Sequence, residues 1–146
     1  MFELPPNLPT PVKAPERVVN TCIAHASKHY GVSPLVMKSL TIVEGGKVGT
    51  TSLNSNKTYD LGIMQINTIH LPAIANKFPG VTWREVTYSP CINIGIGAWL
   101  LSKRMSETTD FWSGVGNYHS KTPKYRDRYL KKVKAAYANL ILKYRG

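Results

Sequence analysis

A single carboxylate, Glu44, is the first candidate for chemistry, because it stands in the stretch TIVEGG between an apolar run and two glycines. Helical spacing predicts a helix over residues 34–44, with Gly45 and Gly46 supplying a left-handed cap, so Glu44 falls in the last turn. A carboxylate there opposes the helix dipole, and burial against the apolar flank adds to the effect, so we expect a raised pKa for Glu44. Such a carboxyl group can act as a general acid near neutral pH, whereas an exposed glutamate at a helix end would have no role.

Few other acidic residues stand close enough in the sequence to assist Glu44. A hydrolase that works through two carboxylates needs the second within about 5–10 Å of the first. Asp60 is the nearby candidate, and its place just before Gly62 favours a turn former that bonds the loop backbone over a catalytic base. The sequence therefore favours chemistry by one carboxylate. Three later segments carry polar residues that could line its site: YDLGIMQIN at 59–67, CINIGIGAWLL at 91–101 and VGNYHSKTP at 115–123.

Taken in order after Glu44, these segments resemble the lytic transglycosylases of the soluble-transglycosylase type, glycoside hydrolase family 23. The likeness is greatest to the small members that accompany conjugation, pili and type III or type IV secretion, and it runs from about residue 18 to 125. It implies a mainly α, lysozyme-like single domain with a polar loop or small hairpin after the catalytic helix. It also implies cleavage of the β-1,4 bond between N-acetylmuramic acid and N-acetylglucosamine of peptidoglycan. One glutamic acid would protonate the glycosidic oxygen and then deprotonate the C6 hydroxyl that attacks C1, giving a 1,6-anhydro sugar without water.

The resemblance assigns Glu44 as the catalytic acid and base, and Tyr118 as the tyrosine whose hydroxyl lies beside that carboxylate. Two departures from the family pattern stand out: Gly45 replaces the usual serine, and Asn117 and His119 flank Tyr118 where the family usually has alanine and asparagine. Any contact made by the usual asparagine is therefore left open at His119. The expected substrate-binding residues, with Met64 packing behind the groove, are Met64, Gln65, Asn67 and His119.

Each of these assignments has an alternative. Gln65 and Asn67 could satisfy buried backbone groups in an irregular segment, and Tyr118 could be a core residue with its hydroxyl at the rim. Asn93 is expected to cap or brace the fold rather than to touch sugar. For the whole chain, the alternatives are a goose-type lysozyme or phage endolysin that hydrolyses the same bond, or a wall-binding or assembly module in which Glu44 is inactive.

The chain is strongly basic, with 19 Lys and Arg against 8 Asp and Glu among its 146 residues. The partner is therefore expected to be anionic, and most of the excess lies in residues 121–146. We expect the basic face of a helix over residues 123–143 either to bind wall or membrane surfaces by diffuse electrostatics or simply to be solvated. Nucleic-acid binding would rest on charge alone, because no recognition motif is present. The expected partners are peptidoglycan strands and components of a secretion or pilus machine, with no cofactor and a monomeric state.

Two cysteines, Cys22 and Cys91, are too few for a disulfide scaffold and are spaced unlike a zinc site. The residues alone leave either one long-range disulfide or two buried thiols, and the resemblance implies that the two cysteines are paired. His25 and His29 follow Cys22 at helical spacing but lack a third ligand, so no metal is expected. The opening segment lacks the apolar run of a secretory leader, and no run approaches transmembrane length. We expect a periplasmic or exported protein from which a leader has been removed.

Local signals predict most of the elements that must position these residues. Helices are expected over 15–30, 34–44, 90–107 and 123–143, the last three each opened by a hydroxyl residue before proline: Ser33, Ser89 and Thr122. A short helix should open at a capping box of Thr82 and Glu85, and another at Thr109 or Asp110. Residues 46–60 are expected to form a loop or small hairpin. We expect residues 1–14, which are rich in proline, to be an extended lead-in to a domain over 15–146.

Overall fold

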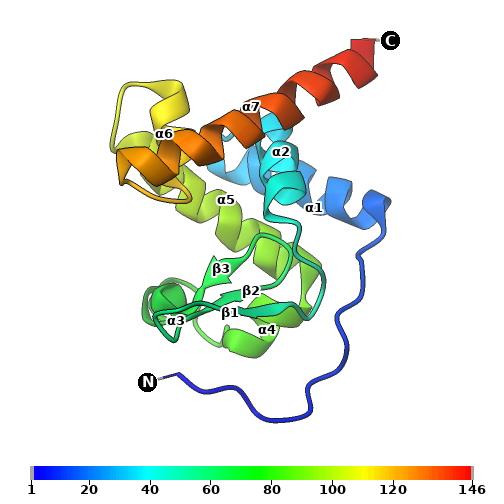
Figure 1. Ribbon diagram of the computed structural model, residues 1–146. Helices are drawn as coiled ribbons and strands as arrows, with labels where there is room; N and C mark the ends of the chain where they lie inside the picture. Colours follow the sequence, from blue (N-terminus) through cyan, green and yellow to red (C-terminus); the bar gives the residue numbers. More distant parts are fainter. Residues whose placement is uncertain (1, 146) are drawn as a thin grey trace.

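The computed structural model describes residues 2–145, in which seven α-helices are joined by one small sheet that lies at one end of the molecule beside α3 and α4 (Figure 1). This architecture confirms the expected mainly α fold with a polar excursion after the helix that carries Glu44. The sheet is antiparallel in the order β1-β2-β3, with Asp60 opposite Asn67. The elements in chain order are α1 (Glu16–Tyr30), α2 (Pro34–Glu44), β1 (Thr51–Leu53), β2 (Tyr59–Leu61), β3 (Ile66–Asn67), a 3₁₀ turn η1 (Thr68–His70), α3 (Leu71–Lys77), α4 (Trp83–Tyr88), α5 (Pro90–Ser106), α6 (Phe111–Asn117) and α7 (Pro123–Arg145).

The predicted caps explain where most helices begin. Side-chain oxygens of Ser33, Ser89 and Asp110 accept hydrogen bonds from backbone N–H groups at the start of α2, α5 and α6. The capping box of Thr82 and Glu85 opens α4 as expected. These bonds satisfy N–H groups that the helices themselves leave free, so the helix starts are encoded locally.

Helix α5 is the central element of the core, packed against α1, α4 and α6, while α2 packs against α7. Its buried face includes Ile94, Ala98 and Leu101, all at most 1% exposed. Met37 and Leu40 of α2 are fully buried as well. The end of α2, and with it Glu44, is therefore held by a rigid helical scaffold.

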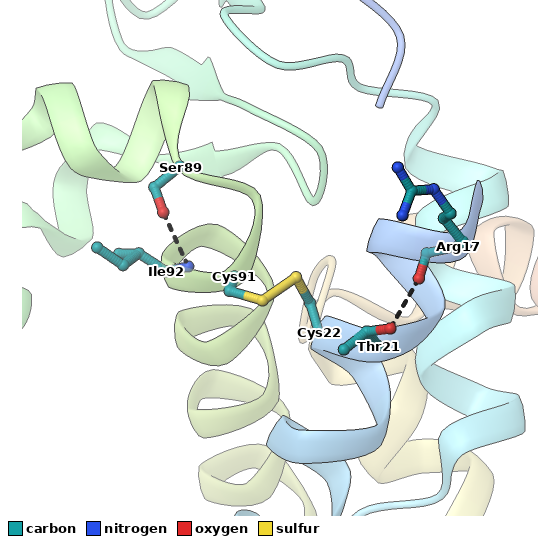
Figure 2. Close-up of a disulfide and its surroundings, with 6 residues drawn as sticks. All are labelled: Arg17, Thr21, Cys22, Ser89, Cys91 and Ile92. Carbon is teal, nitrogen blue, oxygen red and sulfur yellow. Dashed lines mark hydrogen bonds between the residues drawn. A yellow bond between two sulfur atoms is a disulfide. The ribbon is translucent and has the colours of Figure 1, made fainter. Parts of the chain in front are cut away.

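A disulfide joins Cys22 of α1 to Cys91 in the first turn of α5 (Figure 2). The two Cα atoms lie 4.8 Å apart and the cysteines are 69 residues apart in sequence, which confirms the expected pairing. Closing a loop of that size stabilises a fold by about 4 kcal/mol on the chain-entropy model. In the described part of the chain, no three His, Cys, Asp or Glu side chains gather as metal ligands would.

The proline-rich residues 2–14 form no helix, and they contact the rest of the fold. Val12 and Val48 exchange two backbone hydrogen bonds of 2.9 and 3.0 Å, and Ala14 is 8% exposed. The ring of Phe2 lies 6.2 Å from that of Tyr59. The segment therefore contacts the fold near its two ends, and between them it runs along the outside from the sheet to the start of α1 (Figure 1). Within residues 2–145, no helix is long and apolar enough to cross a membrane.

Candidate active site

Glu44 is the last residue of α2, where two glycines turn the chain towards the sheet. Gly45 is the left-handed cap, with φ at 67°, and its N–H donates to the carbonyl of Thr41 at 3.0 Å. Gly46 was expected to share this role, but it serves a different one, because a Cβ at position 46 would overlap the carbonyl oxygen of Gly62. Only glycine allows so close an approach of two backbones. The carboxylate of Glu44 is thereby brought beside the strand that precedes Gly62.

The carboxyl group of Glu44 is partly buried and has the expected raised pKa. The pKa of Glu44 is raised from 4.5 to about 7, mainly by burial and further by the negative charge of Asp60. A hydrogen bond from Tyr129 acts in the opposite direction and lowers it. Burial and a neighbouring carboxylate both disfavour the ionised form. A glutamic acid with this pKa is half protonated near neutral pH, so it can both donate and accept a proton.

The tyrosine that holds Glu44 is Tyr129 of α7, which the sequence did not indicate. Its hydroxyl donates to Oε2 of Glu44 at 2.6 Å, and its side chain is only 6% exposed. Burial and the adjacent Glu44 hold the pKa of Tyr129 well above its usual value, so the phenol remains a donor. The ring of His119 stacks on Tyr129 with centroids 4.5 Å apart and planes 8° from parallel. Together these contacts keep the hydroxyl aimed at Glu44.

Tyr118, which was expected to contact Glu44, is instead bonded to the backbone. Its hydroxyl donates to the carbonyl oxygen of Met64 at 3.1 Å. Tyr118 still lines the same cavity as Glu44, and its pKa is raised by burial and by the charges of Glu44 and Asp60. Tyr118 is thus a neutral neighbour that ties the segment after α6 to the loop between β2 and β3.

Glu44 lines a polar groove of about 380 Å³ between the sheet and the helices. Asp60 lies in this groove on β2, where its Oδ1 accepts a hydrogen bond from Nδ2 of Asn67 at 3.0 Å. The expectation that Asp60 forms a turn was therefore wrong: it is a strand residue with a carboxylate facing the same cavity as Glu44. The turn between β1 and β2 adds Asn54, Ser55, Asn56 and Thr58 to the groove wall.

Gln65 and Asn67 line the groove and also brace its floor. Gln65 adopts a left-handed backbone with φ at 53° and donates from Nε2 to the carbonyl of Gly62 at 3.0 Å. Asn67 donates to Oγ1 of Thr58 at 3.0 Å, and its own Oδ1 caps η1 by accepting from the N–H of Ile69 at 2.9 Å. Both amides are therefore oriented before any ligand arrives, which suits a binding surface.

Met64 and Asn93 lie behind the groove rather than in it. Met64 is fully buried, and its sulfur packs against the α-carbon face of Gly97, so it has no surface to offer a sugar. Asn93 of α5 accepts from the N–H of Met64 at 2.8 Å and donates to the carbonyls of Leu61 and Val86 at 2.9 and 2.8 Å. This confirms the expected bracing role of Asn93, which ties the loop after β2 to the core.

A second cavity of about 280 Å³ lies on the other side of Glu44, against α7. Glu44 and His119 line both cavities, so the two adjoin at these residues, and they are called the two halves of the groove below. In this second half the wall is formed by Tyr125, Arg128 and Lys132 of α7, with Val43 beside them. A larger hollow of about 530 Å³ between α1, α2 and the C-terminal part of α7 does not include Glu44 in its lining.

Comparison with known proteins identifies the family of the chain. Residues 21–141 match the family described as transglycosylase SLT domain. The chain belongs to this family. Similar proteins include invasion protein IagB of Salmonella typhimurium, 32% identical over 82% of this chain and 76% of that protein, and a peptidoglycan-binding-like protein of Escherichia coli O157:H7, 28% identical over 83% and 78%. Protein IpgF of Shigella flexneri is 28% identical over 82% of this chain and 79% of its own. The mainly helical, lysozyme-like fold is that of an SLT domain.

Proposed function

We propose that the protein is a peptidoglycan lytic transglycosylase, a carbon–oxygen lyase that cleaves the β-1,4 bond between N-acetylmuramic acid and N-acetylglucosamine and leaves 1,6-anhydro ends. The observation that carries the proposal is the position of Glu44, a partly buried carboxyl group with its pKa raised to about 7, where the two halves of the groove meet. Membership of the SLT family supports the same substrate class.

The proposed reaction uses Glu44 twice. Protonated Glu44 gives its proton to the glycosidic oxygen as the bond from C1 to that oxygen breaks, and positive charge develops at C1. The resulting carboxylate, stabilised by the hydroxyl of Tyr129, then takes the proton of the C6 hydroxyl as the C6 oxygen bonds to C1. Glu44 ends protonated again, so one residue with a pKa near neutrality can perform both steps.

Asp60 has a supporting place in this scheme. Its carboxylate faces the same half of the groove as Glu44, and a negative charge there stabilises the oxocarbenium-like charge that develops at the sugar ring. The same carboxylate keeps Glu44 protonated to higher pH. Replacing Asp60 by Asn should lower the turnover number by about 10-fold or more, and should move the acid–base pKa of Glu44 downwards.

The presence of Asp60 in the same cavity as Glu44 also favours a second candidate function, hydrolysis by two carboxylates as in a lysozyme. The two reactions differ in their product by one water molecule. Purified sacculi should be digested, and the fragments analysed by mass spectrometry with and without borohydride reduction. Anhydro ends resist reduction and support the transglycosylase. A free reducing muramic acid end would establish hydrolysis instead.

The role of Glu44 is tested in the same assay by Glu44→Gln, which keeps the shape and removes the transferable proton. Activity should fall by the ~10²–10⁴ that general acid–base catalysis contributes. The control is Glu3→Gln, which removes an exposed carboxylate far along the chain from Glu44. An active Glu44→Gln protein would overturn the site assignment, and an inactive wild-type protein would favour a wall-binding or assembly module.

We further propose that Gln65, Asn67 and His119 contact the glycan strand, since all three line the groove beside Glu44. The catalytic groups come from a single chain, which suits a monomer. The disulfide suits an oxidising compartment such as the periplasm, where peptidoglycan is found. Because a relative is named an invasion protein, we propose that the enzyme opens the wall locally for a secretion, conjugation or pilus apparatus.

A further inference from the structure

The two halves of the groove differ in charge. The half beside the sheet holds the carboxylate of Asp60 among neutral polar side chains, and its one guanidinium, Arg104, is paired with Glu107 at 3.2 Å. The half beside α7 has two cations, Arg128 and Lys132, and no carboxylate except Glu44 itself. A polymer that lies along the whole groove therefore passes from a weakly acidic surface to a basic one.

The charges of Arg128 and Lys132 are free to meet a ligand. In the described chain, neither side chain lies within 4.0 Å of a carboxylate oxygen. Other cations of α7 are engaged, since Arg126 pairs with Asp127 at 3.1 Å and the ammonium of Lys134 lies 5.3 Å from the centre of the Trp112 ring. The cations of α7 are therefore not equivalent, because some are held in contacts with neighbouring side chains and others are not.

The positions of Arg128 and Lys132 would allow both side chains to contact a single ligand. Arg128 and Lys132 are four residues apart on a helix, so they project from the same face and frame one cavity. That cavity adjoins the other half of the groove at Glu44 and His119, and Tyr125 adds a second aromatic side chain to its wall. An anionic group carried on the strand that crosses Glu44 would reach both cations without leaving the groove.

We propose that Arg128 and Lys132 bind carboxylates that the muramic acid units carry, and thereby make the enzyme prefer strands that bear them. The proposal rests on the transglycosylase function given above. The sugar rings of peptidoglycan are neutral, so the anions of the strand are the carboxylates attached to muramic acid. They come from two sources, the peptide stem or, where the peptide has been removed, the lactyl group itself.

The test compares kcat/KM on three soluble substrates: strands with their peptide stems, strands freed of peptide by an amidase, and amidase-treated strands whose lactyl carboxylates have been converted to neutral amides. The test variant is Arg128→Gln/Lys132→Gln. The control is Lys131→Gln/Lys134→Gln, which removes the same charge from the same helix but outside the cavity.

The test variant should lose about 10-fold in its preference for carboxylate-bearing over neutral strands, mainly through KM, the size expected of two partly exposed charge contacts. The control should keep the wild-type preference. A fall in kcat/KM confined to peptide-bearing strands assigns the stem as the ligand. A fall confined to the amidase-treated strands that keep their lactyl carboxylates assigns the lactyl group. An unchanged preference in the test variant, equal losses on all three substrates, or an equal change in the control would overturn the proposal. Anhydro products from wild-type protein test the underlying function separately.

Discussion

Replacing Glu44 by Gln should stabilise the protein, and by an amount that depends on pH. Glutamine resembles the protonated form of the side chain and can still accept the hydrogen bond that Tyr129 donates at 2.6 Å. It differs from glutamate in never becoming charged. The variant therefore removes the free-energy cost of holding a carboxylate in a partly buried site beside Asp60.

The size of the effect follows from the pKa of Glu44, which burial raises from 4.5 to about 7. At about 1.4 kcal/mol per pKa unit, this difference corresponds to roughly 3 kcal/mol of folding free energy. The folded chain binds the proton more tightly than the unfolded chain, so the wild-type protein loses stability as the pH rises between these two values. The cost is absent below 4.5 and complete above about 7.

Urea unfolding of wild type and Glu44→Gln should be compared from about pH 4 to about pH 8. The two proteins should be equally stable at the acid end, and the variant should be more stable by about 3 kcal/mol at the alkaline end, or by about 10 °C in Tm. Glu3→Gln, at an exposed position, should show no such growth with pH. A stability difference that does not change with pH would refute the raised pKa and the reasoning that makes Glu44 an acid.

Three further predictions concern the Tyr129 hydroxyl, the close approach at Gly46 and the disulfide. Tyr129→Phe removes a hydrogen bond that stabilises the carboxylate and lowers the pKa of Glu44. The alkaline limb of the pH profile of kcat/KM should therefore move to higher pH by about one unit. A limb that stays in place would show that Tyr129 does not hold Glu44. Gly46→Ala places a Cβ against the carbonyl of Gly62 and should cost about 1–3 kcal/mol in urea unfolding as well as activity. Its control, Gly95→Ala, meets open space on a helix and should stabilise slightly, so equal losses in both variants would contradict the tight approach. Cys22→Ser/Cys91→Ser should lose about 2–4 kcal/mol but keep its activity at low temperature, and an unchanged Tm would show that the bridge contributes nothing.

The features that the sequence predicted well are those encoded within a few residues. Ser33 and Ser89 cap helices because a hydroxyl before proline satisfies the free N–H groups of the next turn. The two glycines after Glu44 placed it at a helix end, and its raised pKa was predicted from the helix dipole together with the apolar flank. The pairing of Cys22 with Cys91 needed the family resemblance, because the residues alone allowed two free thiols.

The features that the sequence missed depend on contacts between distant segments. The buried stripe of α7, formed by Tyr129, Val133, Ala136 and Leu140, was readable as a core-facing pattern, but nothing local shows that the hydroxyl of Tyr129 meets a carboxylate 85 positions earlier. Asp60 was read as a turn residue because Gly62 follows it. The pairing of β2 with β3 across Asn67 instead makes it a strand residue that faces the groove.

The chemistry of Glu44 therefore depends on where the chain goes after α2. Gly45 ends the helix directly behind the carboxylate by taking a left-handed backbone, a conformation that glycine adopts without steric cost. Gly46 then allows β2 to approach, which brings Asp60 to one side of Glu44. Helix α7 supplies Tyr129 on the other side. A carboxylate that is partly buried, repelled by one neighbour and held by another is poised to exchange a proton near neutral pH, and burial is the largest cause of its raised pKa.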